Sequence, residues 1–235
     1  MAGGFPKDVN ANGITGVNPI LFAAALFVFF ASMIPTIAAQ EIIRVSVPWI
    51  PSLGIELAFL VDGLSLTFSL LISGIVTLVL LYSNTYLAGH PQYARFALFL
   101  TAFMVSMLGL VLADDLIVLF VFWELTTLTS YMLIGFSHEA EKSRRNALQA
   151  LFVTGAGGLA FLAGLILLAA VSGTTSISGL LTMGDDLKAH AMYLPILILL
   201  LAGTFTKSAQ VPFHFWLPNA MAAPTPVSAF LHSAT

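Results

Sequence analysis

Long stretches with almost no charged residue set the strongest limit on how this sequence can fold. They cover residues 20–39, 62–81, 94–113, 116–136, 146–171 and 192–210. Each stretch is close to the ~20 apolar residues that an α-helix needs to cross the hydrocarbon core of a bilayer. Because lipid offers the backbone no hydrogen-bond partner, a spanning segment must be a helix or part of a closed barrel. The sequence therefore predicts an all-α membrane protein, a bundle of about six transmembrane helices.

The composition agrees with this fold class. Of the 235 residues, 59% are hydrophobic and 8% are charged, whereas soluble domains carry about a quarter charged residues. Cysteine is absent, which excludes disulfides and thiolate metal sites. Asp185, Asp186 and His190 are too sparse for a metal site, and the basic cluster at residues 142–145 is too small for nucleic-acid binding. We expect no metal, no cofactor and no nucleic acid.

Two regions are expected along the chain. Residues 1–18 are glycine-rich and polar, without the charged start and short apolar core of a cleaved signal, and are predicted to form a flexible N-terminal tail. Residues 19–235 are predicted to form the transmembrane domain, and no repeat or linker divides them. The sequence stops at Thr235 within a new apolar segment, so we expect a fragment from the front of a longer protein.

The connections between the spans carry their own signals. Residues 41–54 alternate polar and apolar side chains, which predicts a short extended segment at the membrane interface. Asp62, Asp114 and Asp115 are predicted to cap helix N-termini, where a carboxylate is favoured by the free amides and the helix dipole. Residues 172–190 are predicted to form a polar loop.

Positive charges in alternate connections predict the orientation. One side of the membrane collects Lys7, Arg95, Lys142, Arg144 and Arg145, and the other collects Arg44 and Lys188. Because cytoplasmic loops carry the excess of lysine and arginine, the first side is predicted to be cytoplasmic, together with the N-terminal tail.

Two charged side chains, Glu124 and Lys207, lie inside predicted spans. An unpaired charge there costs ~2.5 kcal/mol or more, so each needs water or an opposite charge, and such residues are by default candidates for function. Thr127 and Tyr131 share a helix face with Glu124. We expect this face to point into the bundle and Glu124 to interact with Lys207. The alternatives are a proton relay and a static ion pair that orders the bundle.

Prolines are expected to interrupt the chain around Lys207. They stand at positions 35, 212, 218, 224 and 226. Pro35 is predicted to bend the end of the first span. Pro212 and Pro218 each remove a backbone donor, which predicts a break between Ser208 and Asn219 and the start of a further broken helix after it. Transporters build ion sites at such breaks.

Two histidines flank the later prolines. An imidazole can accept a proton that a lysine releases, so His232 is a candidate relay residue, with a hydrogen-bonded packing histidine as the alternative. His214 lies beside Pro212 in the predicted kink and is an accessory candidate, with Thr127 and Tyr131.

Small residues at positions 154–158 predict close helix packing. Gly155, Gly157 and Gly158 follow Thr154, a pattern that lets a second helix approach the backbone. A phosphate-binding loop is the competing interpretation. It fails because no Lys-Ser/Thr pair follows and the stretch lies inside a predicted span.

Four motifs carry a resemblance to a known family. They are DGLS at residues 62–65, FWELTTLTSYMLIGF at 122–136, TKSAQVPFHFWLPNAM at 206–221 and APTPVSAFLHSAT at 223–235. Through them, residues 20–235 resemble the antiporter-like proton-translocating membrane subunits. The A subunit of the Mrp-type multisubunit sodium/proton antiporters is the most similar branch, with relatives in respiratory complex I and membrane-bound hydrogenases. Complex I relatives carry an arginine and an aspartate where this sequence has Gly155 and Gly158, which favours the Mrp branch.

The resemblance implies the first half of an inverted-repeat transporter fold, without the family's helix before residue 20 and its second repeat after residue 235. It implies that Glu124 and Lys207 are the coupled acid and lysine of a proton path that His232 continues. It further implies partner membrane subunits, a place in the cell (inner) membrane and Na⁺ as the exchanged ion, and no enzymatic activity. The alternatives are a subunit of a redox-driven proton pump and a scaffold subunit that transports nothing.

Overall fold

A computed structural model describes residues 18–221 and 223–234 of the protein. The predicted flexible tail at residues 1–18 lies outside this range except for Asn18, whose side chain accepts a hydrogen bond from the amide of Ile20 and caps the first helix. The prediction for the tail therefore stays a prediction.

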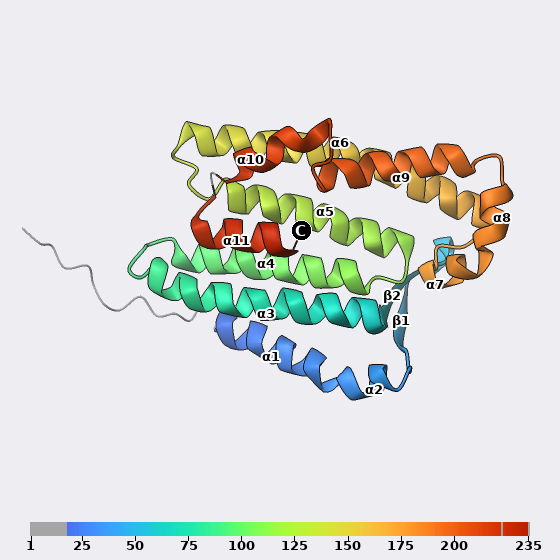
Figure 1. Ribbon diagram of the computed structural model, residues 1–235, viewed down its shortest axis with the longest axis horizontal. Helices are drawn as coiled ribbons and strands as arrows, with labels where there is room; N and C mark the ends of the chain where they lie inside the picture. The colour runs from blue at the N-terminus through green and yellow to red at the C-terminus, as the bar shows by residue number, and fades with distance from the viewer. Residues whose placement is uncertain (1–17, 222, 235) are drawn as a thin grey trace, which may run out of the picture.

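Helices make up most of the described chain and lie side by side as a bundle (Figure 1). They are α1 (Pro19–Ser32), α2 (Ile34–Ala38), α3 (Gly63–Tyr86), α4 (Tyr93–Leu112), α5 (Leu116–Ile134), α6 (Glu141–Ser172), α7 (Ile177–Leu180), α8 (Gly184–Ala189), α9 (Tyr193–Lys207), α10 (Trp216–Ala220) and α11 (Thr225–Ala234). In the described residues, 5 segments are long and apolar enough to cross a membrane, namely Pro19–Ala38, α3, α4, α5 and α6, and α9 is a shorter apolar helix. The predicted all-α membrane bundle is confirmed.

A β-hairpin stands at one end of this bundle. Strands β1 (Ile43–Ile50) and β2 (Ile55–Val61) pair antiparallel and are joined by the short 3₁₀ helix η1 (Pro51–Leu53) and Gly54, which adopts a positive φ of 67°. The extended segment predicted at residues 41–54 is confirmed for Ile43–Ile50, whereas residues 51–53 form η1. Its partner strand was not predicted, because residues 55–61 are mostly apolar and run directly into the predicted span that begins at Asp62.

The start of α3 follows the sequence prediction. Asp62 accepts from the amide of Ser65 at 2.8 Å, and Ser65 Oγ accepts from the amide of Asp62 at 2.8 Å. This reciprocal capping box satisfies two amides at the helix start. Asp62 therefore ends the hairpin and begins the span.

The polar loop predicted at residues 172–190 is wrong. This segment contains α7, the 3₁₀ helix η2 (Leu181–Met183) and α8. Ser176 caps α7 by accepting from the amide of Gly179, and Asp185 and Asp186 stand in the first turn of α8, where carboxylates are favoured. Helices this short have no recognisable hydrophobic periodicity. The prediction of a loop rested on the polar composition of the segment alone.

The chain bends twice at prolines, as predicted. The first span divides between α1 and α2 at Met33, just before Pro35. The helix of Lys207 ends at that residue and is followed by a turn, the 3₁₀ helix η3 (Phe213–Phe215) and α10. The predicted interruption between Ser208 and Asn219 is confirmed.

Hydrogen bonds to neighbouring helices stabilise this interruption. Trp216 Nε1 donates to the carbonyl of Thr206 at 2.9 Å. Asn146 of α6 donates to the carbonyl of Asn219, and Asn219 donates to Gln149 Oε1 of α6. Backbone groups freed by prolines at membrane depth need such partners, and α10 consequently lies along α6 beyond α9 (Figure 1).

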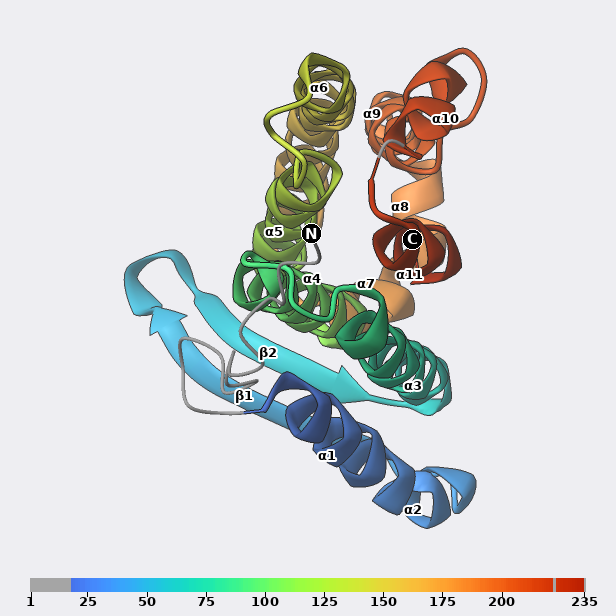
Figure 2. The same ribbon diagram turned by 90° about the vertical axis from the view of Figure 1, so that its left-hand side faces the viewer.

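Close contact between α6 and α9 brings Lys207 into the bundle. The Cβ that Gly203 of α9 lacks would lie 2.5 Å from Phe161 Cβ and 2.9 Å from the carbonyl oxygen of Gly157, both on α6. Only glycine permits this approach. Beyond the break, α11 returns to pack beside α3 and α5 (Figure 2), where Phe230 meets Phe103 edge to face in the main core.

The charged connections divide between the two ends of the bundle. Arg44 and Lys188 lie at the end that holds the hairpin, α7 and α8, and the basic residues at positions 95, 142, 144 and 145 lie at the other end (Figure 1). At that other end, Arg95 donates to the carbonyl of Phe136 at 2.9 Å and joins the α3–α4 and α5–α6 connections. The structure thus groups these charges as the positive-inside argument requires.

Candidate functional site

The ammonium of Lys207 is held by three oxygens of α5. It donates to the carbonyl of Trp123 at 2.8 Å, to Thr127 Oγ1 at 3.0 Å and to Thr126 Oγ1. Thr126 in turn donates its own hydroxyl hydrogen to the carbonyl of Trp123 at 2.7 Å, so its lone pairs are free to face Lys207. All three hydrogens of the ammonium thus have an acceptor on one turn of one helix.

The indole of Trp123 completes this binding site. Lys207 Nζ lies over the ring, 4.7 Å from its centroid, and the ring stacks on Phe161 of α6 at 4.3 Å with 19° between the planes. A cation over an indole face is attracted by the ring's electron density. The lysine is therefore stabilised by an aromatic face and neutral oxygens.

Glu124 points into the bundle, as expected, but its carboxylate is not within ion-pair distance of Lys207. In the described residues, the ion pairs within 4 Å are Arg44 with Asp114 and Lys188 with Asp185. The Glu124 carboxylate extends toward α6, whereas Lys207 reaches the oxygens of α5 from α9. The carboxylate instead lies against Gly158 of α6, with Oε1 buried and without a hydrogen-bond partner in the described chain.

A small cavity joins Lys207 to His232. Its volume is about 30 Å³, and it is lined by Thr126, Thr127, Ser130, Thr154, Trp216 and Leu231 among others, with Lys207 and His232 both on its wall. A polar cavity above ~10–15 Å³ has room for a water molecule. The cavity therefore has room for a water molecule beside both side chains.

His232 is oriented by its own helix. Its Nδ1 lies 2.7 Å from the carbonyl oxygen of Ser228, and because a carbonyl only accepts, Nδ1 carries the hydrogen. Nε2 is then the nitrogen that can take up a further proton. Within the described residues this side chain is exposed, so it has access beyond the cavity.

The three accessory candidates separate in the structure. Thr127 binds Lys207 directly. Tyr131 is half-buried and packs against the main core, and His214 is exposed in η3; neither is among the residues that line the cavity. Trp123 and Thr126 were not predicted as partners of Lys207. A threonine that already bonds to its own helix gives little signal in the sequence.

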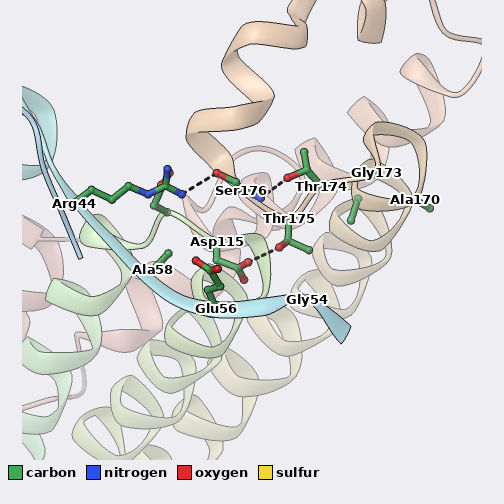
Figure 3. A pocket seen from close by; sticks show the side chains of 12 residues that line it. Arg44, Gly54, Glu56, Ala58, Asp115, Ala170, Gly173, Thr174, Thr175 and Ser176 are labelled. Atoms are coloured by element: carbon green, nitrogen blue, oxygen red, sulfur yellow. Dashed lines mark hydrogen bonds and ion pairs between the residues drawn. The ribbon is translucent and has the colours of Figure 1, made fainter. Parts of the chain in front are cut away.

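A second polar site lies at the hairpin end of the bundle. A pocket of about 760 Å³ is lined by Arg44, Glu56, Asp114, Asp115 and residues 173–176, which come from the hairpin, the start of α5 and the end of α6 (Figure 3). Side chains of both signs share its wall.

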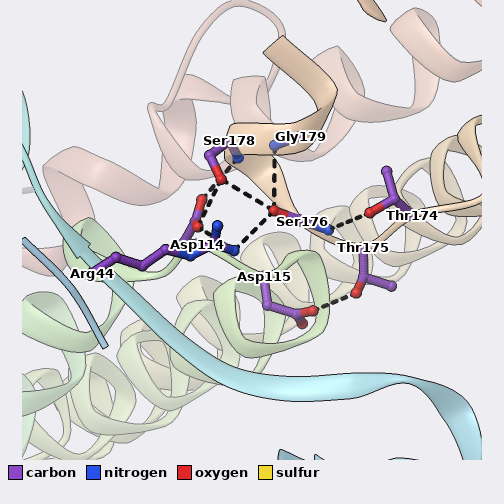
Figure 4. Close-up of polar contacts among 8 residues, drawn as sticks. All are labelled: Arg44, Asp114, Asp115, Thr174, Thr175, Ser176, Ser178 and Gly179. Atoms are coloured by element: carbon purple, nitrogen blue, oxygen red, sulfur yellow. Dashed lines mark hydrogen bonds and ion pairs between the residues drawn. The ribbon is translucent and has the colours of Figure 1, made fainter. Parts of the chain in front are cut away.

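Both aspartates of this pocket form hydrogen bonds or an ion pair with neighbouring residues (Figure 4). Asp115 caps α5 through the amides of Ile117 and Val118, as predicted, and accepts from Thr175 Oγ1 at 2.5 Å. Asp114 does not cap α5, the helix that follows it, but its carboxylate accepts from an amide in the first turn of α7. Asp114 pairs with Arg44 at 3.0 Å and accepts from the amide and hydroxyl of Ser178, so it ties the hairpin to α7.

Two family descriptions match the chain. Residues 113–235 match the family described as NADH:quinone oxidoreductase/Mrp antiporter, transmembrane. Residues 49–97 match the family described as NADH-ubiquinone oxidoreductase (complex I), chain 5 N-terminus. The first match contains Glu124, Lys207 and His232.

Similar curated proteins are components of antiporters. The A subunit of the Na⁺/H⁺ antiporter of Alkalihalophilus pseudofirmus is 48% identical over 222 residues, which are 94% of this chain and 28% of that protein. The putative antiporter subunit mnhA2 of Staphylococcus aureus is 48% identical over 209 residues, 88% of this chain and 26% of that protein. The chain thus spans about a quarter of the length of these curated relatives.

Two solved structures share the fold. The Mrp complex from a Dietzia species superimposes with a TM-score of 0.82 at 39% identity, over 92% of this chain and 23% of that one. An archaeal respiratory membrane complex, the membrane-bound sulfane sulfur reductase, superimposes with a TM-score of 0.78 at 20% identity, over 90% of this chain and 43% of that one. The second likeness concerns the fold alone.

Proposed function

Because the chain belongs to the NADH:quinone oxidoreductase/Mrp antiporter transmembrane family, we propose that it is the proton-conducting front part of the A subunit of a multisubunit cation/proton antiporter. The antiporter components to which it is similar are nearly half identical to it over most of its length. The complete protein is then a multi-pass component of a secondary transporter in the cell membrane, with other membrane subunits as partners and Na⁺ as the exchanged ion.

One observation carries the proposed proton path. A lysine inside the bundle, bonded to three oxygens of a neighbouring helix, faces a water-sized cavity that ends at a histidine. Lysine can release and regain a proton when its surroundings change, and the histidine Nε2 can accept it. In this proposal Glu124 supplies protons to Lys207, and His232 carries them onward.

Replacing Lys207 with arginine tests the proposal. A guanidinium keeps its proton at any working pH, so Lys207→Arg should reduce proton flux as much as Lys207→Ala does. The measurement is proton flux in membrane vesicles that hold the complete antiporter complex, with assembly checked in parallel. Lys188→Arg, at an exposed lysine of α8, is the control and should transport normally.

Two outcomes of this experiment would contradict the relay. Near-normal flux in Lys207→Arg would leave Lys207 as a structural cation. Normal flux in both Lys207 variants would instead favour a scaffold subunit that transports nothing itself.

A further inference from the structure

Two adjacent glycines of α6 face two different helices. A Cβ on Gly157 would overlap the side chain of Thr206, the residue before Lys207 on α9. A Cβ on Gly158 would overlap Oε1 of Glu124 on α5. Both glycines are buried. Because they have no side chains, they leave space on α6 that is filled by Glu124 of α5 and by Thr206 of α9.

Two polar atoms without partners meet at Gly158. Glu124 Oε1 and Trp123 Nε1 are both buried and have no hydrogen-bond partner in the described residues. The position of a Cβ on Gly158 lies 3.6 Å from Trp123 Nε1 and in contact with Glu124 Oε1. An indole N–H only donates and a carboxylate only accepts, so the two groups are complementary across this space.

We propose that Gly158 is a positioning residue that holds the Glu124 carboxylate in a notch on α6, beside the indole N–H of Trp123. Trp123 then contacts both members of the proposed relay: its ring face and carbonyl bind the ammonium of Lys207, and its N–H edge faces the carboxylate. The acid is kept apart from the lysine, and it reaches Lys207 only by leaving the notch. This consequence for transport rests on the proposed function, whereas the position of the carboxylate does not.

Gly155 provides a matched control on the same helix. No atom lies within 4 Å of the place where its Cβ would stand. Gly155→Ala should therefore fit without displacing anything and should slightly favour the helix, because alanine is the better helix former. An effect seen in Gly158→Ala but not in Gly155→Ala can therefore be attributed to contact between the new methyl group and the Glu124 carboxylate.

The first measurement is the rate at which a carboxyl reagent labels Glu124. The complete protein in its assembled complex is treated with dicyclohexylcarbodiimide, a lipophilic reagent for carboxyl groups, and labelling of Glu124 is followed by mass spectrometry. The methyl of Gly158→Ala should expel the carboxylate from the notch and speed labelling several-fold, while Gly155→Ala should label as the wild type does. Equal labelling rates in all three proteins would overturn the proposal.

The second measurement is proton flux against pH in vesicles. A displacement of a catalytic group on the order of 1 Å can cost up to about a hundredfold in rate, so Gly158→Ala should lower flux about ten- to a hundredfold and change the pH profile. Glu124→Asp in the Gly158→Ala background shortens the acid by one methylene and should restore part of the flux. A further loss in the double variant would mean a packing defect and overturn the positioning role.

Two additions keep the test decisive. If Gly158→Ala does not assemble, Trp123→Phe replaces it, because it keeps an aromatic ring for Lys207 but removes the N–H; unchanged labelling of Glu124 in that variant would overturn the proposal. Glu124→Gln tests the relay separately. Normal flux in Glu124→Gln would refute the proposed function, while the labelling rates would still decide where the carboxylate lies.

Discussion

Lys207 shows how a bundle can hold a cation without a counter-ion in contact. Placing the charge inside a membrane costs ~2.5–3.5 kcal/mol on insertion scales. A hydrogen bond to a charged group contributes about 1.5–3 kcal/mol, and a desolvated cation–π contact adds up to ~2 kcal/mol. Three hydrogen bonds and the Trp123 ring together are enough to offset the cost. Neutral acceptors also leave the lysine free to change its protonation state, which a tight ion pair would oppose.

The hydroxyls that bind Lys207 can be tested one at a time. Thr126→Val keeps the shape of the side chain but removes an acceptor, at a cost of about 1–3 kcal/mol. Since ~1.4 kcal/mol corresponds to a factor of ten, we expect proton flux in vesicles to fall on the order of tenfold. Thr129→Val is the control, because Thr129 bonds only to carbonyls of its own helix. Equal flux in the two variants would show that the hydroxyl of Thr126 plays no part.

Asp114 joins secondary-structure elements at the end of the bundle that holds the β-hairpin. This residue is 3% exposed and binds β1 through Arg44 and the entry to α7 through Ser178. Asp115, its neighbour, caps α5 and holds Thr175. Three elements, β1, α5 and α7, and the connection that holds Thr175 therefore meet at two consecutive carboxylates, which keep the start of the helix carrying Glu124 in place.

Asp114→Asn should destabilise this end of the protein. The substitution removes the charge that pairs with Arg44 and one acceptor of the bonds from Ser178, and loss of a buried hydrogen-bond partner costs ~1–3 kcal/mol. The midpoint of thermal unfolding of the complete protein in detergent should fall. Asp185→Asn is the control, since its ion pair with Lys188 is solvent-exposed and contributes little. An unchanged midpoint for Asp114→Asn would show that the network is not needed for stability.

The whole molecule has two chemically different ends. One end carries the hairpin, α7, α8 and the acidic residues 114, 115, 185 and 186, and the other carries Arg95 and the basic start of α6. Cytoplasmic loops collect lysine and arginine. The proton path that we propose at Lys207 lies between these ends, as an alternating-access site requires.

Single cysteines can test the orientation, because the 235 residues contain none. With a membrane-impermeant maleimide on intact cells, Asp185→Cys should react and Glu139→Cys should not, since the basic side is expected to be cytoplasmic. Both positions are exposed in the structure, so both should react after permeabilisation, which is the internal control. Labelling of Glu139→Cys alone in intact cells would reverse the orientation.

Much of the architecture can be predicted from the sequence alone. Apolar length determines the spans, since an α-helix that crosses a bilayer needs about 20 residues. Asp62 and Asp115 mark helix starts because a carboxylate satisfies free amides there, and Pro212 lies in the break after α9 because proline has no amide hydrogen. These signals are local, so no partner from elsewhere in the chain is needed to read them.

Only the tertiary structure decides which groups meet. Glu124 and Lys207 are the two charges of opposite sign within spans. Packing nevertheless directs the Glu124 carboxylate against α6, while Lys207 of α9 binds oxygens of α5. Pairing of Asp114 with Arg44 joins residues far apart in sequence, so no periodic pattern reveals it. The site depends on helix rotation and close approach at glycines, which are set by packing between helices and not by the composition of any one of them.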